Sequence, residues 1–350
     1  MKKLIIALIC FSFVLAGCSS GKQEAKNKQE VTSSAEKKEN VLSDGTDVEI
    51  PEVTPNEFYT MATSDVRPVA VMIDNDSDAA RPQIGLESAY IVYEIIVEGG
   101  ASRFMALFKD YRLEKIGPVR SSRHYFLDYA LENDAIYAHA GWSPLAQSDI
   151  PKLGVNNING LLGGDDRCFW RDNTYDKTYH NYYTSIKALS ERAKNVKGYS
   201  LTTNGNLLEF FKQDTELKGT DCSTLDFKYS NKYRVSFTYN PEKAVYERYI
   251  NGKKHTSQTG DVLAAKNIIV YNVTNYDLND GQKKGRQNLN NIGNGEGWYI
   301  SLGKAQKITW SKQTRTGKTV YKTEDGKDLT VNPGTTYIQI IPQSSKIDIK

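Results

Sequence analysis

The sequence has little of several features that would assign a function directly. Only 4 cysteines occur in 350 residues, and after residue 17 no apolar run is long enough to cross a bilayer. The 45 Lys and Arg nearly balance the 42 Asp and Glu, so the net charge of +3 is too small to indicate nucleic acid as the main partner. No P-loop, dinucleotide-binding fingerprint or G-x-S-x-G serine occurs. The remaining composition, 39% hydrophobic and 25% charged, is typical of a globular protein rather than a collagen-like or disordered chain.

The first twenty residues carry an export signal. Lys2 and Lys3 precede a short apolar stretch, Leu4–Leu15, and small residues lead to Cys18 in the order L-A-G-C. We therefore predict that residues 1–17 are a signal peptide. The L-A-G-C order resembles the bacterial lipobox, which implies that the cysteine is acylated, for instance with palmitate, and becomes the first residue of the mature protein. The alternative is an ordinary secretory cleavage site with an incidental cysteine.

Residues 18–49 differ in composition from the segments on either side. They consist mainly of Ser, Lys, Glu, Gln and Asn, with few large apolar side chains. Such a segment cannot bury enough apolar surface to fold, so we predict a disordered tether with a reach on the order of 30 Å. The folded body is therefore expected on the extracytoplasmic face of the cell membrane, anchored there by lipid.

Two further cysteines, Cys168 and Cys222, lie in the body of the protein. In an oxidising compartment they could form one disulfide worth roughly 4 kcal/mol. Two cysteines in a body of this size are no disulfide framework, so we expect buried free thiols, with the bridged pair as the alternative.

Hydrophobic patterns in the first half predict alternating strands and helices. A short apolar strand covers 68–74, and strands over 88–98 and 103–109 form an antiparallel hairpin around Gly99-Gly100. A further strand is predicted over 134–139. Capping residues predict helix starts at three places: Ser121 or Ser122, Ser143 before Pro144, and Thr184 or Ser185.

The second half changes to β-branched and aromatic patterns that are interrupted by tight turns. The dipeptide Asn251-Gly252 is a strong signal for a two-residue hairpin turn. We therefore predict an α+β fold with an α+β domain at 50–215 and a mostly β domain at 225–350. The strands predicted in the second half cover 233–239, 245–250, 267–274, 297–302, 306–310 and 336–342.

The body also carries a series of distinctive segments. They are RPVAVMIDN (67–75), ARPQIG (80–85), YEIIVEGGASRF (93–104), IGPVRSSR (116–123), HAGWSPLA (139–146), FWRD (169–172), HNYYTS (180–185), NIIV (267–270) and NPGTTYIQ (332–339). Together these segments resemble the YerB-like lipoprotein family of Gram-positive bacteria over nearly everything after residue 50. The resemblance implies a surface lipoprotein with a mixed-sheet, layered α/β N-terminal subdomain and a mostly β C-terminal subdomain. It implies no known reaction and no known catalytic residue.

Two glutamates in the predicted hairpin, Glu94 and Glu98, suggest acid–base chemistry. They lie four residues apart on one strand, roughly 13 Å at ~3.3 Å per residue, whereas the carboxylate pairs of glycosidases need about 5–9.5 Å. In the expected register Glu98 lies opposite Arg103 and forms a cross-strand ion pair. Glu94 is flanked by apolar residues and requires a polar partner or a pocket. An envelope hydrolase that uses Glu94 and His139 as acid and base is therefore one alternative function.

Patterns for metal binding are weak. The segment Asp74–Asp78 starts like a calcium loop, D-x-D-x-D, but Ala79 and Gly85 stand where Gly and Glu are needed. We therefore expect a polar turn after the strand rather than a calcium site.

The four histidines are not spaced as local metal ligands. His139 and His180 could converge in space with Asp165 or Asp166, but nothing in the sequence brings them together. We therefore predict no metal and no cofactor.

The strongest candidate site is the basic segment Gly117–Arg123, which places two arginines and two serines where a turn becomes a helix start. The free N–H groups of a helix N-terminus and the guanidinium groups of Arg120 and Arg123 could bind a carboxylate or a phosphate. Alternatively, Ser121 is only a helix cap and the arginines pair with nearby acids such as Glu94, Glu98 or Asp128. The predicted ligand-binding residues are Arg120, Ser121, Ser122, Arg123, His139, Trp142, Arg171 and His180.

The sequence thus predicts a lipid-anchored envelope protein that binds an anionic ligand, a cell-wall component or a metabolite, at the basic segment. The hydrolase is a second possibility. A third is an interaction lipoprotein that binds another cell-surface protein through the β domain. A buried acid near His139 in a cleft would favour the enzyme, and a large exposed apolar patch would favour the interaction protein.

Overall fold

The computed structural model of the chain describes residues 54–203 and 205–350. The predicted signal peptide, the predicted acylation site Cys18 and the predicted tether lie outside the described residues. The described body belongs to one compact unit. Within it, no helix is long and apolar enough to cross a membrane.

Four α-helices and four short 3₁₀ turns connect the strands of the described body. The α-helices are α1 (Pro55–Thr63), α2 (His124–Glu132), α3 (Pro144–Lys152) and α4 (Ile186–Asn195). The 3₁₀ turns are η1 (Asp78–Ala80), η2 (Leu86–Ser88), η3 (Glu98–Gly100) and η4 (Asp165–Cys168). Two of the predicted helix starts are confirmed, because the side chain of Ser143 caps α3 and that of Ser185 caps α4.

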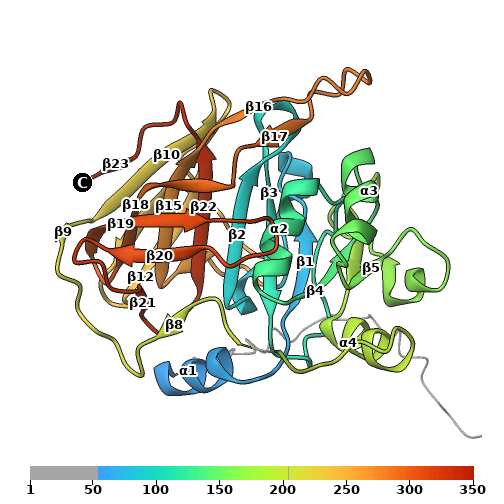
Figure 1. Ribbon diagram of the computed structural model, residues 1–350, viewed down its shortest axis with the longest axis horizontal. Helices are drawn as coiled ribbons and strands as arrows, with labels where there is room; N and C mark the ends of the chain where they lie inside the picture. The colour runs from blue at the N-terminus through green and yellow to red at the C-terminus, as the bar shows by residue number, and fades with distance from the viewer. Residues whose placement is uncertain (1–53, 204) are drawn as a thin grey trace, which may run out of the picture. The chain divides into compact units, whose positions relative to one another are not determined.

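The central sheet has eleven strands and a mixed pattern of directions (Figure 1). Strands β1, β2, β4, β5, β15 and β22 run in the same direction, and β3 returns antiparallel between β1 and β2. In spatial order the sheet contains β20 (Val320–Thr323), β19 (Lys304–Lys312), β18 (Gly293–Ser301), β15 (Asn267–Val273), β22 (Thr336–Pro342), β2 (Ile91–Ile96), β3 (Ser102–Phe108), β1 (Val69–Ile73), β4 (Ile136–His139) and β5 (Asn157–Asn159), with β9 (Thr220–Asp221) beside β19. The predicted α+β class with a mixed sheet is confirmed.

A second sheet of six strands is built entirely from the second half of the chain. It contains β13 (Lys253–Lys254), β12 (Val245–Ile250), β11 (Tyr233–Asn240), β10 (Thr224–Ser230) and β23 (Asp348–Ile349), with β14 (Ala264–Ala265) beside β12. Buried and more exposed residues alternate along β10 and β12, which is the pattern of strands with one face toward the core. Three two-stranded pairs complete the fold: β16 (Asn275–Asp277) with β17 (Gln287–Leu289), β8 (Glu209–Phe210) with β21 (Thr330–Val331), and β6 (Phe169–Arg171) with β7 (Tyr182–Thr184).

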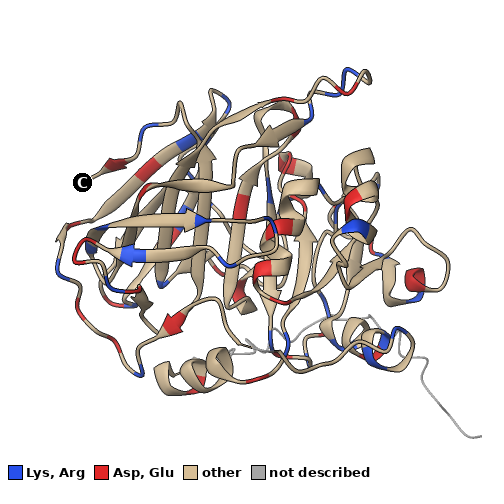
Figure 2. Cartoon of the chain, in the orientation of Figure 1, with Lys and Arg blue, Asp and Glu red and all other residues tan. Residues whose placement is uncertain are grey.

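The central sheet includes strands from both predicted domains. β22 lies between β15, from the second half of the chain, and β2, from the first half. Its residues are buried along the whole strand, so the hydrophobic core is continuous across the two halves. Lys and Arg, like Asp and Glu, are distributed over both halves, and neither sign of charge is confined to one of them (Figure 2). The boundaries at 50–215 and 225–350 stay a prediction.

Several local predictions are confirmed in detail. Strand β22 covers the predicted range, and β2 pairs antiparallel with β3. The turn at Asn251-Gly252 joins β12 to β13 with φ of 49° and 79° at its two residues. Positive φ at both central residues is what a type I′ hairpin requires, which explains the Asn-Gly pair there.

Two local predictions are wrong. Neither Ser121 nor Ser122 caps α2, which begins at His124 after Arg123 and has no side-chain cap. The reason is that Ser122 is held in extended backbone by a bridge to Trp142.

The predicted pairing of Glu98 with Arg103 is also absent, because the turn starts earlier than expected. Strand β2 ends at Ile96 and η3 follows, so Arg103 lies opposite Ile95. Glu98 instead pairs with Arg123.

Candidate functional site

The parallel strands β1 and β4 place their carboxyl ends side by side at one end of the central sheet. Open α/β sheets commonly bind ligands beside the carboxyl ends of their strands. The basic segment 117–123 runs along this end of the sheet, since the N–H of Asp74 donates to the carbonyl of Pro118 and that of Ser122 donates to Gly141. The backbone thereby brings the loops after β1 and β4 together with the basic segment.

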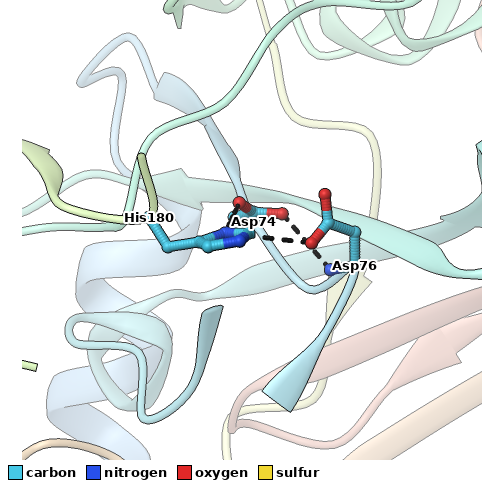
Figure 3. A group of neighbouring side chains, drawn as sticks. All are labelled: Asp74, Asp76 and His180. Atoms are coloured by element: carbon cyan, nitrogen blue, oxygen red, sulfur yellow. Dashed lines mark hydrogen bonds and ion pairs between the residues drawn. The ribbon is translucent and has the colours of Figure 1, made fainter. Parts of the chain in front are cut away.

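Asp74, the first residue after β1, is fully buried and contacts the side chains of Arg120 and His180. Figure 3 shows Asp74 beside His180 and Asp76. Oδ2 of Asp74 lies 2.5 Å from Nε of Arg120 and 2.7 Å from Nδ1 of His180. Asp76 lies 3.3 Å from Nη2 of Arg120 and 3.8 Å from Nδ1 of His180. We call Asp74, Asp76, Arg120 and His180 the Asp74 cluster.

The electrostatic environment keeps Asp74 ionised. Burial alone would raise the pKa of this carboxyl, but the hydrogen bond from His180 and the charges of Arg120 and Arg103 outweigh burial and lower the pKa below its usual value. Because a carboxylate only accepts hydrogen bonds, Nδ1 of His180 carries the proton in the contact with Asp74.

The other side of the His180 ring faces a serine. Nε2 of His180 lies 3.5 Å from Oγ of Ser77, the residue before η1. Tyr179 contacts two members of the cluster. Its ring centre lies 4.1 Å from that of His180 and 4.7 Å from the guanidinium carbon of Arg120. His180 is only 2% exposed, whereas Tyr179 is 58% exposed and shields it from solvent.

The Asp74 cluster has the donor types of a metal site, but the contacts favour a salt-bridge network. Asp74, Asp76 and His180 place one possible ligand atom each within 4.8 Å of one another. Both carboxylates already contact a cation, the guanidinium of Arg120. Arg120 and His180 contact the same oxygen of Asp74, Oδ2. A divalent ion would have to displace this guanidinium.

A second charge pair lies at the same end of the sheet. Nε and Nη2 of Arg123 contact the two carboxylate oxygens of Glu98 at 2.5 and 2.9 Å. Burial raises the pKa of Glu98, but the hydrogen bonds and charge of Arg123 lower it by more, so the net shift is downward. Buried Arg103 donates from Nη1 to the carbonyl of Ser121 at 2.7 Å. Both arginines of the basic segment are therefore bound to carboxylates of the protein, as in the alternative interpretation of this segment.

A buried ionic network connects the two sheets. Nη2 of Arg248, in β12, lies 2.8 Å from both carboxylate oxygens of Glu94, in β2. Nη1 of Arg248 contacts Nδ1 of His255 at 2.5 Å, and Nε2 of His255 contacts Oε1 of Gln83 at 2.7 Å. The amide of Asn75 donates to Glu94 at 3.3 Å and joins this network to the loop after β1. Arg248 is the polar partner that buried Glu94 requires.

A pocket of about 280 Å³ lies beside this network, between the loop around η1 and the β12–β13 hairpin. Three cations, Arg81, Lys253 and Lys254, line it together with one acid, Asp78. We call it the basic pocket. Its other lining residues are Pro82, Ile250, Asn251, His255 and Thr256.

The remaining residues of the predicted ligand site contact protein groups. Ser122 accepts a hydrogen bond from the hydroxyl of Tyr137 at 2.8 Å. His139 is fully buried, and its ring lies 5.8 Å from that of Trp142. Arg171 donates to an asparagine oxygen at 2.6 Å. Of the predicted ligand-binding residues, Arg120 and His180 therefore meet at Asp74, and His139 and Trp142 lie together at the end of β4.

The residues of the predicted hydrolase occupy different environments. Among the described residues, the side-chain partners of Glu94 are Asn75, Ser102, Tyr233 and Arg248. The ring nitrogens of His139 contact the Gly141 carbonyl and Asn157. Burial lowers the pKa of His139 to about 4, so its imidazole is neutral at pH 7.

The proposed convergence of His139 and His180 on the acids near 165 is not formed. His180 contacts Asp74, and the carboxylate of Asp165 forms ion pairs with Arg192 and Lys197. Asp74 and Asp165 form ion pairs with nearby arginine and lysine side chains, and the two histidines do not meet at a shared metal site.

Cys168 and Cys222 are buried free thiols, which confirms the expectation from the sequence. Burial raises the pKa of both thiols. Neither cysteine has the depressed pKa of a reactive nucleophile.

Arg248 was missed from the sequence, whereas Asp74, Ser77 and Arg103 were considered there in other roles, as part of a polar turn and as the partner of Glu98. One signal was available for Arg248, because it lies in phase with the buried positions Tyr246 and Ile250 of an alternating strand. An arginine at a core-facing position needs a buried acid. For the contact between Ser77 and His180 no local signal exists, since 103 residues separate them.

If the arginines of the basic segment stabilise the fold, replacing both should lower stability without any ligand. We expect Arg120→Gln with Arg123→Gln to lower the free energy of unfolding by about 1–3 kcal/mol at pH 7, because Asp74 and Glu98 lose their cations while His180 still donates to Asp74. Both carboxyl pKa values are lowered in the folded state, so this stabilisation is present above the unfolded pKa of about 4 and is lost as the pH falls through the folded values.

The measurement is urea unfolding at pH 7 and at decreasing pH. The double variant should lose less stability on acidification than the parent protein. Arg112→Gln is the control, because Arg112 is 90% exposed in its pair with Asp110. Equal stability of the double variant and the parent at pH 7 would contradict a structural role for the two pairs.

Comparisons with known proteins agree with this fold. A family described as "Protein of unknown function (DUF3048) N-terminal domain" matches residues 55–200, and the corresponding C-terminal domain matches residues 225–338. The protein named "Putative lipoprotein YerB" from Bacillus subtilis (strain 168) is 34% identical over 279 residues, which cover 79% of this chain and 81% of that protein. The crystal structure of the YerB protein from Bacillus subtilis matches with a TM-score of 0.69 and 32% identity, over 81% of this chain and 94% of that chain.

Proposed function

Because the chain belongs to the DUF3048 family, we propose that it is a lipid-anchored protein of the cell envelope that binds a small anionic ligand in the basic pocket. The anchor is supported by the L-A-G-C order that ends at Cys18 and by the name of the Bacillus subtilis relative, which describes a lipoprotein. The apolar stretch before Cys18 is an export signal, so the folded body lies on the outer side of the cell membrane.

The charge of the basic pocket is the observation that carries the ligand proposal. The residues that line the pocket include three cations, Arg81, Lys253 and Lys254, but one acid, Asp78. Arg81 contacts Asp78, whose side chain is fully exposed, and Lys254 contacts Glu247 outside the pocket lining. Lys253 forms no ion pair within the described part of the chain. The pocket therefore has positive charge that no protein carboxylate fully compensates, which attracts an anion.

The floor and size of the pocket restrict what it holds. His255 lines the pocket as a neutral imidazole, because burial and the charges of Arg248 and Arg81 lower its pKa well below the usual value. A volume of about 280 Å³ lies just below the range of ~300–1,000 Å³ that is typical of small-molecule pockets. A carboxylate or phosphate group on a larger envelope molecule fits this space and its charge.

The basic pocket suits an anion better than the basic segment 117–123 does. Arg120 and Arg123 are already bound to Asp74, Asp76 and Glu98, so a ligand there would have to compete with three carboxylates. Lys253 has no such competitor.

The test is a thermal melt of the full mature protein with increasing inorganic phosphate, compared with chloride at equal ionic strength. A ligand at ten times its Kd stabilises the native state by about 1.4 kcal/mol, which raises the melting temperature by a few degrees. We expect Lys253→Gln with Lys254→Gln to remove most of this rise and to leave the melting temperature without phosphate nearly unchanged.

The matched control is Lys322→Gln with Lys327→Gln, two exposed lysines around the β20 turn. This control should keep the full response to phosphate. An undiminished response in the Lys253/Lys254 variant would exclude the basic pocket as the site. A response that disappears only in the Arg120/Arg123 variant would move the ligand to the basic segment.

A further inference from the structure

Three side chains, those of Asp74, His180 and Ser77, contact one another in sequence beside the loop after β1. Oδ2 of Asp74 accepts from Nδ1 of His180 at 2.7 Å, and Nε2 on the other side of the same ring lies 3.5 Å from Oγ of Ser77. Asp74 is fully buried, His180 is 2% exposed and Ser77 is half-buried. An acid, an imidazole and a hydroxyl thus lie in the order used by serine nucleophiles in several unrelated folds.

The hydrogen-bond directions are those that a nucleophile needs. Ionised Asp74 fixes the proton on Nδ1 of His180, so in the neutral imidazole Nε2 has a free lone pair facing the Ser77 hydroxyl. A separation of 3.5 Å is longer than an optimal hydrogen bond, but such contacts are commonly long before substrate binds. Arg120 stabilises the orienting acid and does not contact Ser77.

From this geometry we propose that Ser77 is a nucleophile activated by His180, with Asp74 orienting the imidazole, and that the protein hydrolyses carboxylic esters of anionic envelope molecules. The choice of anionic esters rests on the proposed function of the basic pocket. That pocket begins at Asp78, the residue directly after Ser77, and Arg81 follows on the same loop. The loop thus carries the nucleophile and part of the anion site within five residues.

The reaction has two balanced halves. Oγ of Ser77 attacks the carbonyl carbon while its proton moves to Nε2 of His180, and the ester C–O bond breaks as that proton passes to the leaving alcohol. Water then attacks the acyl carbon, gives a proton to His180, and the acid leaves as the proton returns to Ser77. The net change is ester plus water to acid plus alcohol, so no oxidant, reductant or other co-reactant is needed.

The oxyanion formed in both halves needs a donor near Ser77. In α/β-hydrolases one donor is the backbone N–H of the residue after the nucleophile. Here that residue is Asp78, the first residue of η1, and its N–H donates to no protein acceptor among the described residues.

The experiment uses a fluorophosphonate probe on the full mature protein in detergent. Phosphonylation forms a bond between Oγ and phosphorus as fluoride leaves, so each modified chain gains one adduct mass. We expect a single adduct, placed on Ser77 by peptide mapping, that Ser77→Ala abolishes. His180→Gln should slow labelling by about 10²-fold, since it removes the general base.

Two controls separate catalysis from folding. Ser311→Ala changes a partly buried serine of β19 and should label like the parent protein. Thermal melts of each variant report whether it folds, and the location of the adduct in the parent protein needs no variant. Absence of an adduct on Ser77 in the folded parent protein would overturn the nucleophile, and so would equal labelling rates of the parent and a folded His180→Gln variant.

The same samples separate this proposal from the anion-binding proposal. Ser77→Ala should keep the phosphate-induced rise in melting temperature, because Ser77 does not line the basic pocket. A phosphate response without labelling would overturn the nucleophile alone. Labelling without a phosphate response would overturn the pocket and, with it, the assignment of anionic esters.

Discussion

Arg248→Met should lower the free energy of unfolding by about 3–5 kcal/mol, because it removes one partner of a buried ion pair. Arg248 and Glu94 are both fully buried, and one guanidinium nitrogen contacts both carboxylate oxygens of Glu94 at 2.8 Å. Without the arginine, Glu94 would be left as a buried charge with only neutral partners. The guanidinium carbon also lies 5.2 and 6.0 Å from the ring centres of Phe104 and Phe237, so the loss includes these cation–π contacts as well as the ion pair.

The measurement is equilibrium urea unfolding, with Arg234→Met as the matched control. Arg234 lies on the neighbouring strand β11 and also pairs with an acid, but its side chain is 63% exposed. Exposed pairs contribute about 0–1 kcal/mol, so the control should change stability little.

A double variant tests whether the loss comes from the stranded charge. Glu94→Gln with Arg248→Met removes both charges of this buried pair, so it should be more stable than Arg248→Met alone. If the double variant is as unstable as the sum of the two single variants, the network contributes through packing and hydrogen bonds instead of charge.

The strands were predictable because their signals are local. The apolar run of β22, the alternation along β12 and the Asn-Gly turn at 251–252 each depend on residues that are neighbours in the sequence. Burial on one or both faces fixes these patterns regardless of how the chain continues.

The partners of the buried charges were not predictable in the same way. The sequence shows that Glu94 in an apolar strand needs a polar partner, but Arg248 lies 154 residues away on another sheet. His180 lies 106 residues from Asp74. Such contacts depend on sheet order and loop paths, which a single sequence does not specify.

The basic segment shows how a correct local observation led to an incorrect local structure. Two arginines and two serines before an apolar helix indicate a capped helix start and an anion site. In the structure the segment runs beside the end of β1, because the N–H of Asp74 donates to the carbonyl of Pro118 and the N–H of Arg120 donates to the carbonyl of Met72. Ser122 pairs with the loop after β4, and the carbonyl of Ser121 accepts a hydrogen bond from Arg103. The two arginines of the segment pair with acids that follow β1 and β2.

Cys18→Ala should move nearly all of the protein out of the membrane fraction of a bacterial host that processes lipoproteins. Residues 1–53 lie outside the described structure, so this expectation rests on the sequence and on the proposed anchor. Each acyl chain on the cysteine contributes ~0.8 kcal/mol per buried methylene, about 10 kcal/mol for a long chain, and two chains suffice for stable anchoring.

The measurement is fractionation into membrane, soluble and medium fractions, with the processed size determined by intact mass. Cys18→Ala should appear in the medium or accumulate as an unprocessed precursor that lacks acyl mass. Cys10→Ala is the matched control, because Cys10 lies within the apolar stretch of the same signal peptide and should leave processing and anchoring unchanged. A Cys18→Ala protein that is processed normally and stays in the membrane would show that something other than this cysteine holds the body there, and the lipid anchor would have to be abandoned.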